Sequence, residues 1–131
     1  MHLTFPKSEA LHGSDVYSHV AVIPPGATLV VVGGQNAVDT SGKLVGEGDV
    51  VAQARQVLIN LEAALKAGGC SWSDVFRVTV WIAEGADLRA AYGVFAPTFG
   101  ASKTPPVVSV AVVRGLARPG VLLEVGVEAA R

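Results

Sequence analysis

The sequence predicts an α+β fold in which two helices cover one face of a mixed β-sheet. Two segments carry apolar residues at helical spacing, several others are β-branched, and strands come before, between and after the helices. The 131 residues are expected to form a single domain, residues 1–131. Because two helices cover only one face of such a sheet, we expect another subunit to cover the second face.

The first two strands are expected at residues 20–23 and 29–32, which are rich in β-branched residues. The segment 24–28 between them reads Pro-Pro-Gly-Ala-Thr, and proline and glycine favour turns. This pattern predicts a hairpin. Residues 33–35, Gly-Gly-Gln, then end the strand, and the polar residues 39–43 predict a loop.

The clearest helix follows Asp49, a residue type that caps helix N-termini well. Apolar residues recur there every three or four positions, which indicates one buried face. These residues are Val50, Ala54, Val57, Leu58, Leu61 and Leu65. Gly68 and Gly69 are expected to end the helix, because glycine adopts the left-handed conformation of a C-terminal cap.

A strand is predicted at residues 76–82, where apolar residues alternate with Arg77, Thr79 and Trp81. A second helix follows, with apolar residues from Leu88 to Phe99 at helical spacing and with Asp87 as its cap. Pro97 is expected to end or kink this helix, because proline lacks an N–H donor.

The last two strands are predicted at residues 107–113 and 121–129. Glu124 interrupts the apolar pattern of the second one, and carboxylates are rarely buried without a partner. Two interpretations remain open. Glu124 is either half of a salt bridge at an edge or interface, or a pocket carboxylate that polarises a water molecule.

Composition limits the classes of partner. Ten Lys and Arg against eleven Asp and Glu give a net charge of −1, so we expect no binding to nucleic acid or to a membrane surface. Apolar residues make up 50% of the chain and charged residues only 16%. This balance predicts that apolar surface is hidden between subunits.

Cysteine and histidine usage indicates no metal site. Cys70 is the only cysteine in the sequence, which excludes an internal disulfide and a zinc site of paired thiolates. His2, His12 and His19 are not at metal-ligand spacing with other ligand types. The sequence also has no apolar run of signal-peptide or transmembrane length, so we expect a cytoplasmic protein.

Several short segments, each common alone, occur together in one order across nearly the whole chain. They are Val-Val-Gly-Gly-Gln (31–35), Asp-Thr-Ser-Gly-Lys-Leu-Val (39–45), the helical residues 53–61, the strand residues 74–82, Pro-Pro (105–106) and Leu-Glu-Val (123–125). In this order and spacing the chain resembles the YjgF/RidA family of reactive intermediate deaminases, also called L-PSP endoribonucleases.

The resemblance implies a chorismate-mutase-like fold and a homotrimer with clefts between neighbouring subunits. The family's best-known members hydrolyse imine and enamine intermediates to 2-keto acids and ammonia without a cofactor. In that family an arginine of a Pro-x-Arg segment holds the substrate carboxylate, a glutamate positions the attacking water, and a tyrosine near the N-terminus lines the pocket.

Five residues of this chain fall at the family's pocket positions. Glu124 matches the glutamate and is the expected catalytic residue, and Tyr17 matches the tyrosine. Gly33 and Ser109 stand at two further ligand-binding positions. Val107 replaces the arginine, so the expected cleft prefers a neutral or differently anchored ligand to a 2-imino acid.

Three functions follow as hypotheses. The first is a hydrolase or deaminase acting on a small imine, enamine or related carbonyl compound, without a cofactor or metal. The second is a trimer that binds a small metabolite without chemistry, which Val107 favours and Glu124 disfavours. The third is an endoribonuclease, which the balanced charge disfavours. A chorismate mutase is weaker still, because that chemistry needs arginines in the cleft.

Overall fold

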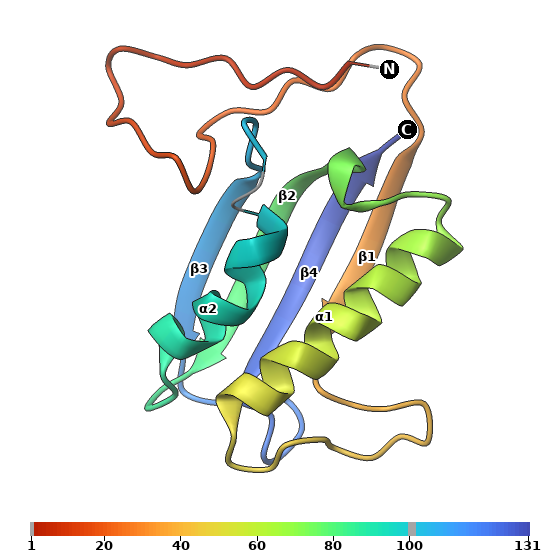
Figure 1. Ribbon diagram of the computed structural model, residues 1–131, viewed down its shortest axis with the longest axis vertical. Helices are drawn as coiled ribbons and strands as arrows, with labels where there is room; N and C mark the ends of the chain where they lie inside the picture. The colour runs from red at the N-terminus through yellow and green to blue at the C-terminus, as the bar shows by residue number, and fades with distance from the viewer. Residues whose placement is uncertain (1, 100–101) are drawn as a thin grey trace.

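The computed structural model describes residues 2–99 and 102–131 (Figure 1). In chain order the elements are β1 (Leu29–Gln35), α1 (Val50–Ala67), a short 3-10 helix (Trp72–Asp74), β2 (Val75–Ala83), α2 (Leu88–Phe99), β3 (Val107–Val113) and β4 (Leu123–Ala130). Residues 2–28 run as an irregular segment past one end of the sheet.

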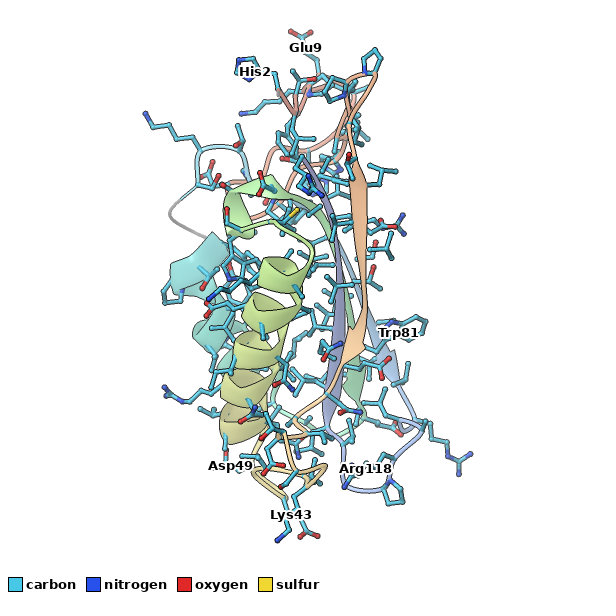
Figure 2. The ribbon with its side chains drawn as sticks, turned by 90° about the vertical axis from the view of Figure 1, so that its right-hand side faces the viewer. His2, Glu9, Lys43, Asp49, Trp81 and Arg118 are labelled. Carbon is cyan, nitrogen blue, oxygen red and sulfur yellow. The ribbon has the colours of Figure 1, made fainter. Side chains whose placement is uncertain are left out.

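The four strands form one mixed sheet in the order β1-β4-β2-β3. β2 and β3 are parallel, whereas β4 is antiparallel to both of its neighbours. Both helices pack on the same face, as Figures 1 and 2 show, so the predicted α+β class is confirmed. Neither helix of the described chain combines the length and the apolar character that crossing a membrane requires.

The ends of α1 confirm the predicted caps. The Asp49 carboxylate accepts a hydrogen bond of 3.0 Å from the backbone N–H of Ala52. At the other end Gly69 has a φ of +74°, and the N–H of Cys70 donates to the carbonyl of Leu65 at 2.8 Å. These bonds satisfy backbone groups that a helix end leaves free, and they fix where α1 starts and stops.

The predicted hairpin is wrong. Residues 20–23 form no strand with β1; instead Val22 makes an isolated antiparallel bridge with Thr4. β1 pairs with β4, beginning with Leu29 opposite Ala130. The turn itself exists, with Gly26 at a φ of +82°, but turn residues show where a chain bends and not which strand lies beside which.

Pro97 was expected to end or to kink α2, and it does not end the helix. The helix continues through Pro97 to Phe99. Its start is as predicted, because the Asp87 carboxylate accepts from the N–H of Ala90 at 3.0 Å. Pro97 removes only one donor from the final turn, and the rings of Phe95 and Phe99 stack 5.9 Å apart across that turn.

The face of the sheet away from the helices, here called the open face, is uncovered within one chain. It carries alternate residues of each strand, and Val31 and Trp81 there are 70% and 44% exposed. Trp81 projects from the side opposite the helices in Figure 2. This exposure agrees with the expectation that one chain cannot bury both faces of the sheet.

Candidate functional site

Three of the predicted site residues lie on the open face. Glu124 belongs to β4, and Val107 and Ser109 belong to β3, with β2 between these strands. In the ladder of β2 and β3, Val107 is opposite Arg77 and Ser109 is opposite Thr79. The alternation of the strands therefore brings these side chains to one face.

Glu124 is half-buried and lies opposite Trp81 in the neighbouring strand. Against its other side lies Gly34 of β1, where a Cβ atom added to the glycine would come within 2.5 Å of the Glu124 Oε2 atom. Glycine is therefore required at position 34 for this carboxylate position. Within residues 2–99 and 102–131, no hydrogen bond or ion pair engages the Glu124 carboxylate.

β1 is irregular where it passes this carboxylate. Its register with β4 shifts between Val32 and Gln35, so Gly33 and Gly34 interrupt the regular ladder. The Gln35 side chain folds back and donates from Nε2 to the Gly33 carbonyl at 3.1 Å. Gly33 therefore contributes backbone, not a side chain, to the surroundings of Glu124.

A shallow hollow of about 240 Å³ lies on the open face, with Val31, Thr79, Gly126 and the pair Arg77–Glu128 around it. Arg77 Nε lies 3.7 Å from Glu128 Oε2. Arg77 is not among the site residues that the sequence predicts. The sequence could have indicated it, because the alternation of residues 76–82 puts Arg77 on the face opposite the apolar residues.

No arginine of the described chain replaces the missing cation beside Val107. Arg77 is next to Val107 in the ladder, but Glu128 offsets its charge. Arg114 follows the last residue of β3 and so lies at the far end of that strand from Val107. Arg118 donates from Nη2 to the carbonyl of Gly42 at 3.0 Å, in a loop. Val107 itself therefore offers no charge to a free carboxylate, and the guanidinium opposite it, that of Arg77, is shared with Glu128.

Tyr17 lies away from Glu124 in the same chain. Its hydroxyl is hydrogen-bonded to His12 Nε2, and its ring packs edge-on to His19 at 5.4 Å. Tyr17 also lines a cavity on the helix side of the sheet, whereas Glu124 is on the open face. The structure thus brings Glu124, Val107 and Ser109 to one face and leaves Tyr17 outside it.

Metal-ligating side chains are not gathered in the described part of the chain. No group of three or more His, Cys, Asp or Glu residues there could hold a metal ion. The half-buried Cys70 follows the C-terminal end of α1, where burial and, to a smaller extent, the charge of Asp74 raise the pKa of its thiol. A raised pKa disfavours the reactive thiolate, so Cys70 is not prepared for nucleophilic chemistry.

Comparison with curated proteins relates part of this chain to named deaminases. The chain is 38% identical over 74 residues to a goat (Capra hircus) protein named 2-iminobutanoate/2-iminopropanoate deaminase, a match covering 56% of this chain and 53% of the relative. It is 40% identical over 75 residues to the RutC family protein PH0854 of Pyrococcus horikoshii, covering 57% and 60%. The chain thus spans somewhat more than half the length of these curated relatives.

Solved structures match over nearly the whole chain. The Rid-family protein YyfB of Yersinia pestis, whose function is unknown, has a TM-score of 0.84 at 28% identity, and each chain is covered completely. Rv2704 of Mycobacterium tuberculosis, a YjgF/YER057c/UK114 family member, has a TM-score of 0.66 at 30% identity, covering 99% and 100%. TdcF of E. coli with bound serine has a TM-score of 0.70 at 26% identity, covering 91% and 96%.

The family itself follows from the extent of the match. The sequence model described as Endoribonuclease L-PSP matches residues 7–131, which includes every helix and strand of the described structure. The neighbouring structures share the same arrangement of two helices on a mixed sheet. The chain therefore belongs to the endoribonuclease L-PSP family, also known as the YjgF/RidA family.

Proposed function

We propose that this protein is a cofactor-independent hydrolase of a small imine, enamine or related carbonyl metabolite, in which Glu124 orients the attacking water. The observation that carries this proposal is the Glu124 carboxylate on the open face beside Gly34, with no hydrogen bond or ion pair to any other described residue. A carboxylate with free oxygen atoms can accept a hydrogen bond from water and take its proton. The relatives named deaminases support the class of reaction.

The proposed reaction needs only water and proton transfer. Glu124 accepts a proton from the water as the water oxygen forms a bond to the imine carbon, and the electron pair of the C=N bond moves to nitrogen. The same carboxyl group then returns the proton to nitrogen. This gives a carbinolamine. Glu124 then takes the hydroxyl proton of the carbinolamine and passes it to the nitrogen, so the C–N bond breaks as the C=O bond forms, and ammonia or an amine leaves. No oxidant or reductant enters this sequence.

The substrate class follows from Val107 and from the pair Arg77–Glu128. Valine offers no charge to a substrate carboxylate, and the nearby guanidinium is already partnered. Leaving a substrate anion unpaired in a cleft costs on the order of 2–5 kcal/mol, so a neutral imine is the preferred substrate. Backbone amides near Gly33 and Ser109 are the proposed polar contacts to it.

We also propose a homotrimer whose clefts lie between subunits. The open face carries exposed apolar residues, Val31 and Trp81 among them. Their exposure supports a neighbouring subunit that covers this face. Within one chain Tyr17 does not share a face with Glu124. If a tyrosine lines the cleft, it is therefore the Tyr17 of a neighbouring subunit.

The second candidate is a trimer that binds a small metabolite without converting it. Val107 favours this alternative, because it removes the charged contact that would hold a substrate anion in place. An endoribonuclease is disfavoured, since the net charge is −1 and the open-face cation Arg77 is paired with Glu128.

The test is a comparison of two imine classes. An amine oxidase generates neutral imines in the assay, and an amino-acid oxidase generates 2-imino acids, while formation of the carbonyl product is followed with and without the protein. We expect acceleration that depends on Glu124 and is larger for neutral imines. Saturable binding without acceleration supports the binding protein instead. If no imine binds and none is hydrolysed faster in the presence of the protein, both proposals are contradicted.

A further inference from the structure

A cavity of about 170 Å³ lies under α2, on the opposite side of the sheet from Glu124. Val80 and Val125 of β2 and β4 contribute to its floor, and Phe95 of α2 lies over it. Val108 and Val110 of the edge strand β3 line the side of the cavity at the edge of the sheet. Side-chain alternation in β4 puts Leu123 and Val125 in this cavity and Glu124 on the other face, so the two sites are separate.

The walls of this cavity are almost entirely carbon. No charged residue lines it in the described part of the chain, and the only side-chain polar atoms among the described lining residues are the hydroxyls of Tyr17 and Tyr92. The Tyr17 hydroxyl is already bonded to His12. Tyr92 is 42% exposed, so water reaches it. A charged or strongly polar ligand would leave its own polar groups unpaired in this cavity.

We propose that the cavity is a binding site for a small apolar aromatic molecule, one ring with at most short alkyl substituents. Its volume is close to the roughly 150 Å³ of an apolar cavity known to stay dry and to bind benzene. Tyr17, Tyr92, Phe95 and Phe99 all line it, and aromatic rings favour offset or edge-to-face contact with another ring. The volume is too small for a long acyl chain.

The entrance lies along the edge of the sheet. Val110 is 49% exposed although it lines the cavity, so solvent reaches the cavity wall at this edge strand. Tyr92, also at the exposed margin, lies on the α2 side. A ligand can therefore enter between α2 and β3 without unfolding the core beneath it, which consists of buried residues such as Val78 and Ile82.

The test is a titration of the intact protein with toluene, followed by NMR of the valine and leucine methyl groups. We expect saturable shifts of the methyl groups of Val80, Val108, Val110 and Val125, and NOEs from the toluene ring to them. Absence of saturable shifts contradicts the proposal. The proposal is also contradicted if the chemical shifts of these methyl groups change with protein concentration but not with toluene. A second copy of the chain then covers the entrance.

A matched pair of variants locates the binding. Val110→Phe places a ring in the cavity, so we expect toluene affinity to fall by about tenfold or more. Val112→Phe is the control, because Val112 is on the same strand and face, is 63% exposed, and lies outside the lining among described residues. The affinity of the Val112→Phe variant for toluene should equal that of the parent. Equal losses in both variants overturn the proposal, and the NOEs to the parent protein decide the matter if Val110→Phe does not fold.

Discussion

Val107 is the residue at which this chain departs from the pocket of the family it resembles. We predict that Val107→Arg gives measurable binding of pyruvate or 2-ketobutyrate, tighter than the parent by about tenfold, because a charge-assisted hydrogen bond contributes about 1.5–3 kcal/mol. Isothermal calorimetry on both proteins measures the gain. Val107→Met is the control for side-chain length without charge. If the arginine variant binds no better than the methionine variant, the geometry of the cleft has diverged beyond this one residue.

Cys70 provides a residue-scale test of local burial. Desolvation, helped by Asp74 and opposed by Arg131, raises the pKa of the Cys70 thiol above its ordinary value. The thiolate fraction at neutral pH is therefore lower in the folded protein than in the unfolded chain. We predict that the pH profile of alkylation by iodoacetamide has its midpoint at higher pH for folded than for urea-unfolded protein, as measured by mass spectrometry. Coincident midpoints would show that the thiol is not desolvated.

At the scale of elements, α1 is joined to two loops by one buried side chain. Gln53 is 0% exposed. Its Nε2 donates to the carbonyls of Gly46 and Gly120 at 3.1 and 2.9 Å, and its Oε1 accepts from the N–H of Leu122 at 2.8 Å. These bonds connect the loop before α1 to the loop before β4. Glu124 is a residue of β4.

We predict that Gln53→Leu lowers the free energy of unfolding by about 2–4 kcal/mol, because buried backbone groups lose their partners. Gln56→Leu is the matched control: its Nε2 donates to the side chain of Asn60 and not to the backbone of a loop. That change should cost less than about 1 kcal/mol. Urea unfolding of both variants beside the parent measures the difference. Similar costs for the two would mean that the loops do not depend on Gln53.

Local signals predicted the elements that local chemistry determines. Asp49 and Asp87 cap α1 and α2 as expected, and Glu124, which interrupts the apolar pattern of β4, is half-buried between the buried residues Leu123 and Val125. The pairing of β1 could not be predicted, because its partner β4 lies at the other end of the chain. The course of α2 through Pro97 depends on tertiary packing of the last turn, which the sequence pattern does not contain.

The candidate site was predictable to the same degree. Residues of regular strands, Glu124, Val107 and Ser109, lie on one face as alternation requires. Tyr17 belongs to an irregular segment whose path depends on the bonds of Ser18 to Pro105 and Pro106, so no periodicity could place it. Arg77 was missed because a charged residue in an alternating strand is also the ordinary sign of an exposed position.

The proposed trimer of the complete protein depends on the open face of the sheet. Val31 is 70% exposed there, and in a trimer with the sheets facing inward it would be buried. We predict that the parent has the mass of three 13.4 kDa chains and that Val31→Glu dissociates it, because a buried unpaired carboxylate is costly. Light scattering after size exclusion measures both masses.

Ile59→Glu is the matched control for that experiment, since Ile59 is 58% exposed but lies on α1, away from the open face. It should leave the mass unchanged. A monomeric parent at micromolar concentration contradicts the proposed assembly. Dissociation by Ile59→Glu and not by Val31→Glu would move the interface to the helices.

The proposed function requires that Glu124 is a catalytic carboxylate and not a structural one. The measurement that tests it most directly compares Glu124→Gln with the parent in imine hydrolysis and in thermal unfolding, on the same preparations. Glutamine has nearly the volume of glutamate, and no hydrogen bond from another described residue is lost, so the unfolding free energy should change by less than about 1 kcal/mol. Turnover should fall by about 100-fold or more, because the group that takes the proton is lost. Unchanged turnover, or a loss of about 3–5 kcal/mol of stability as expected for a broken buried ion pair, would contradict the account.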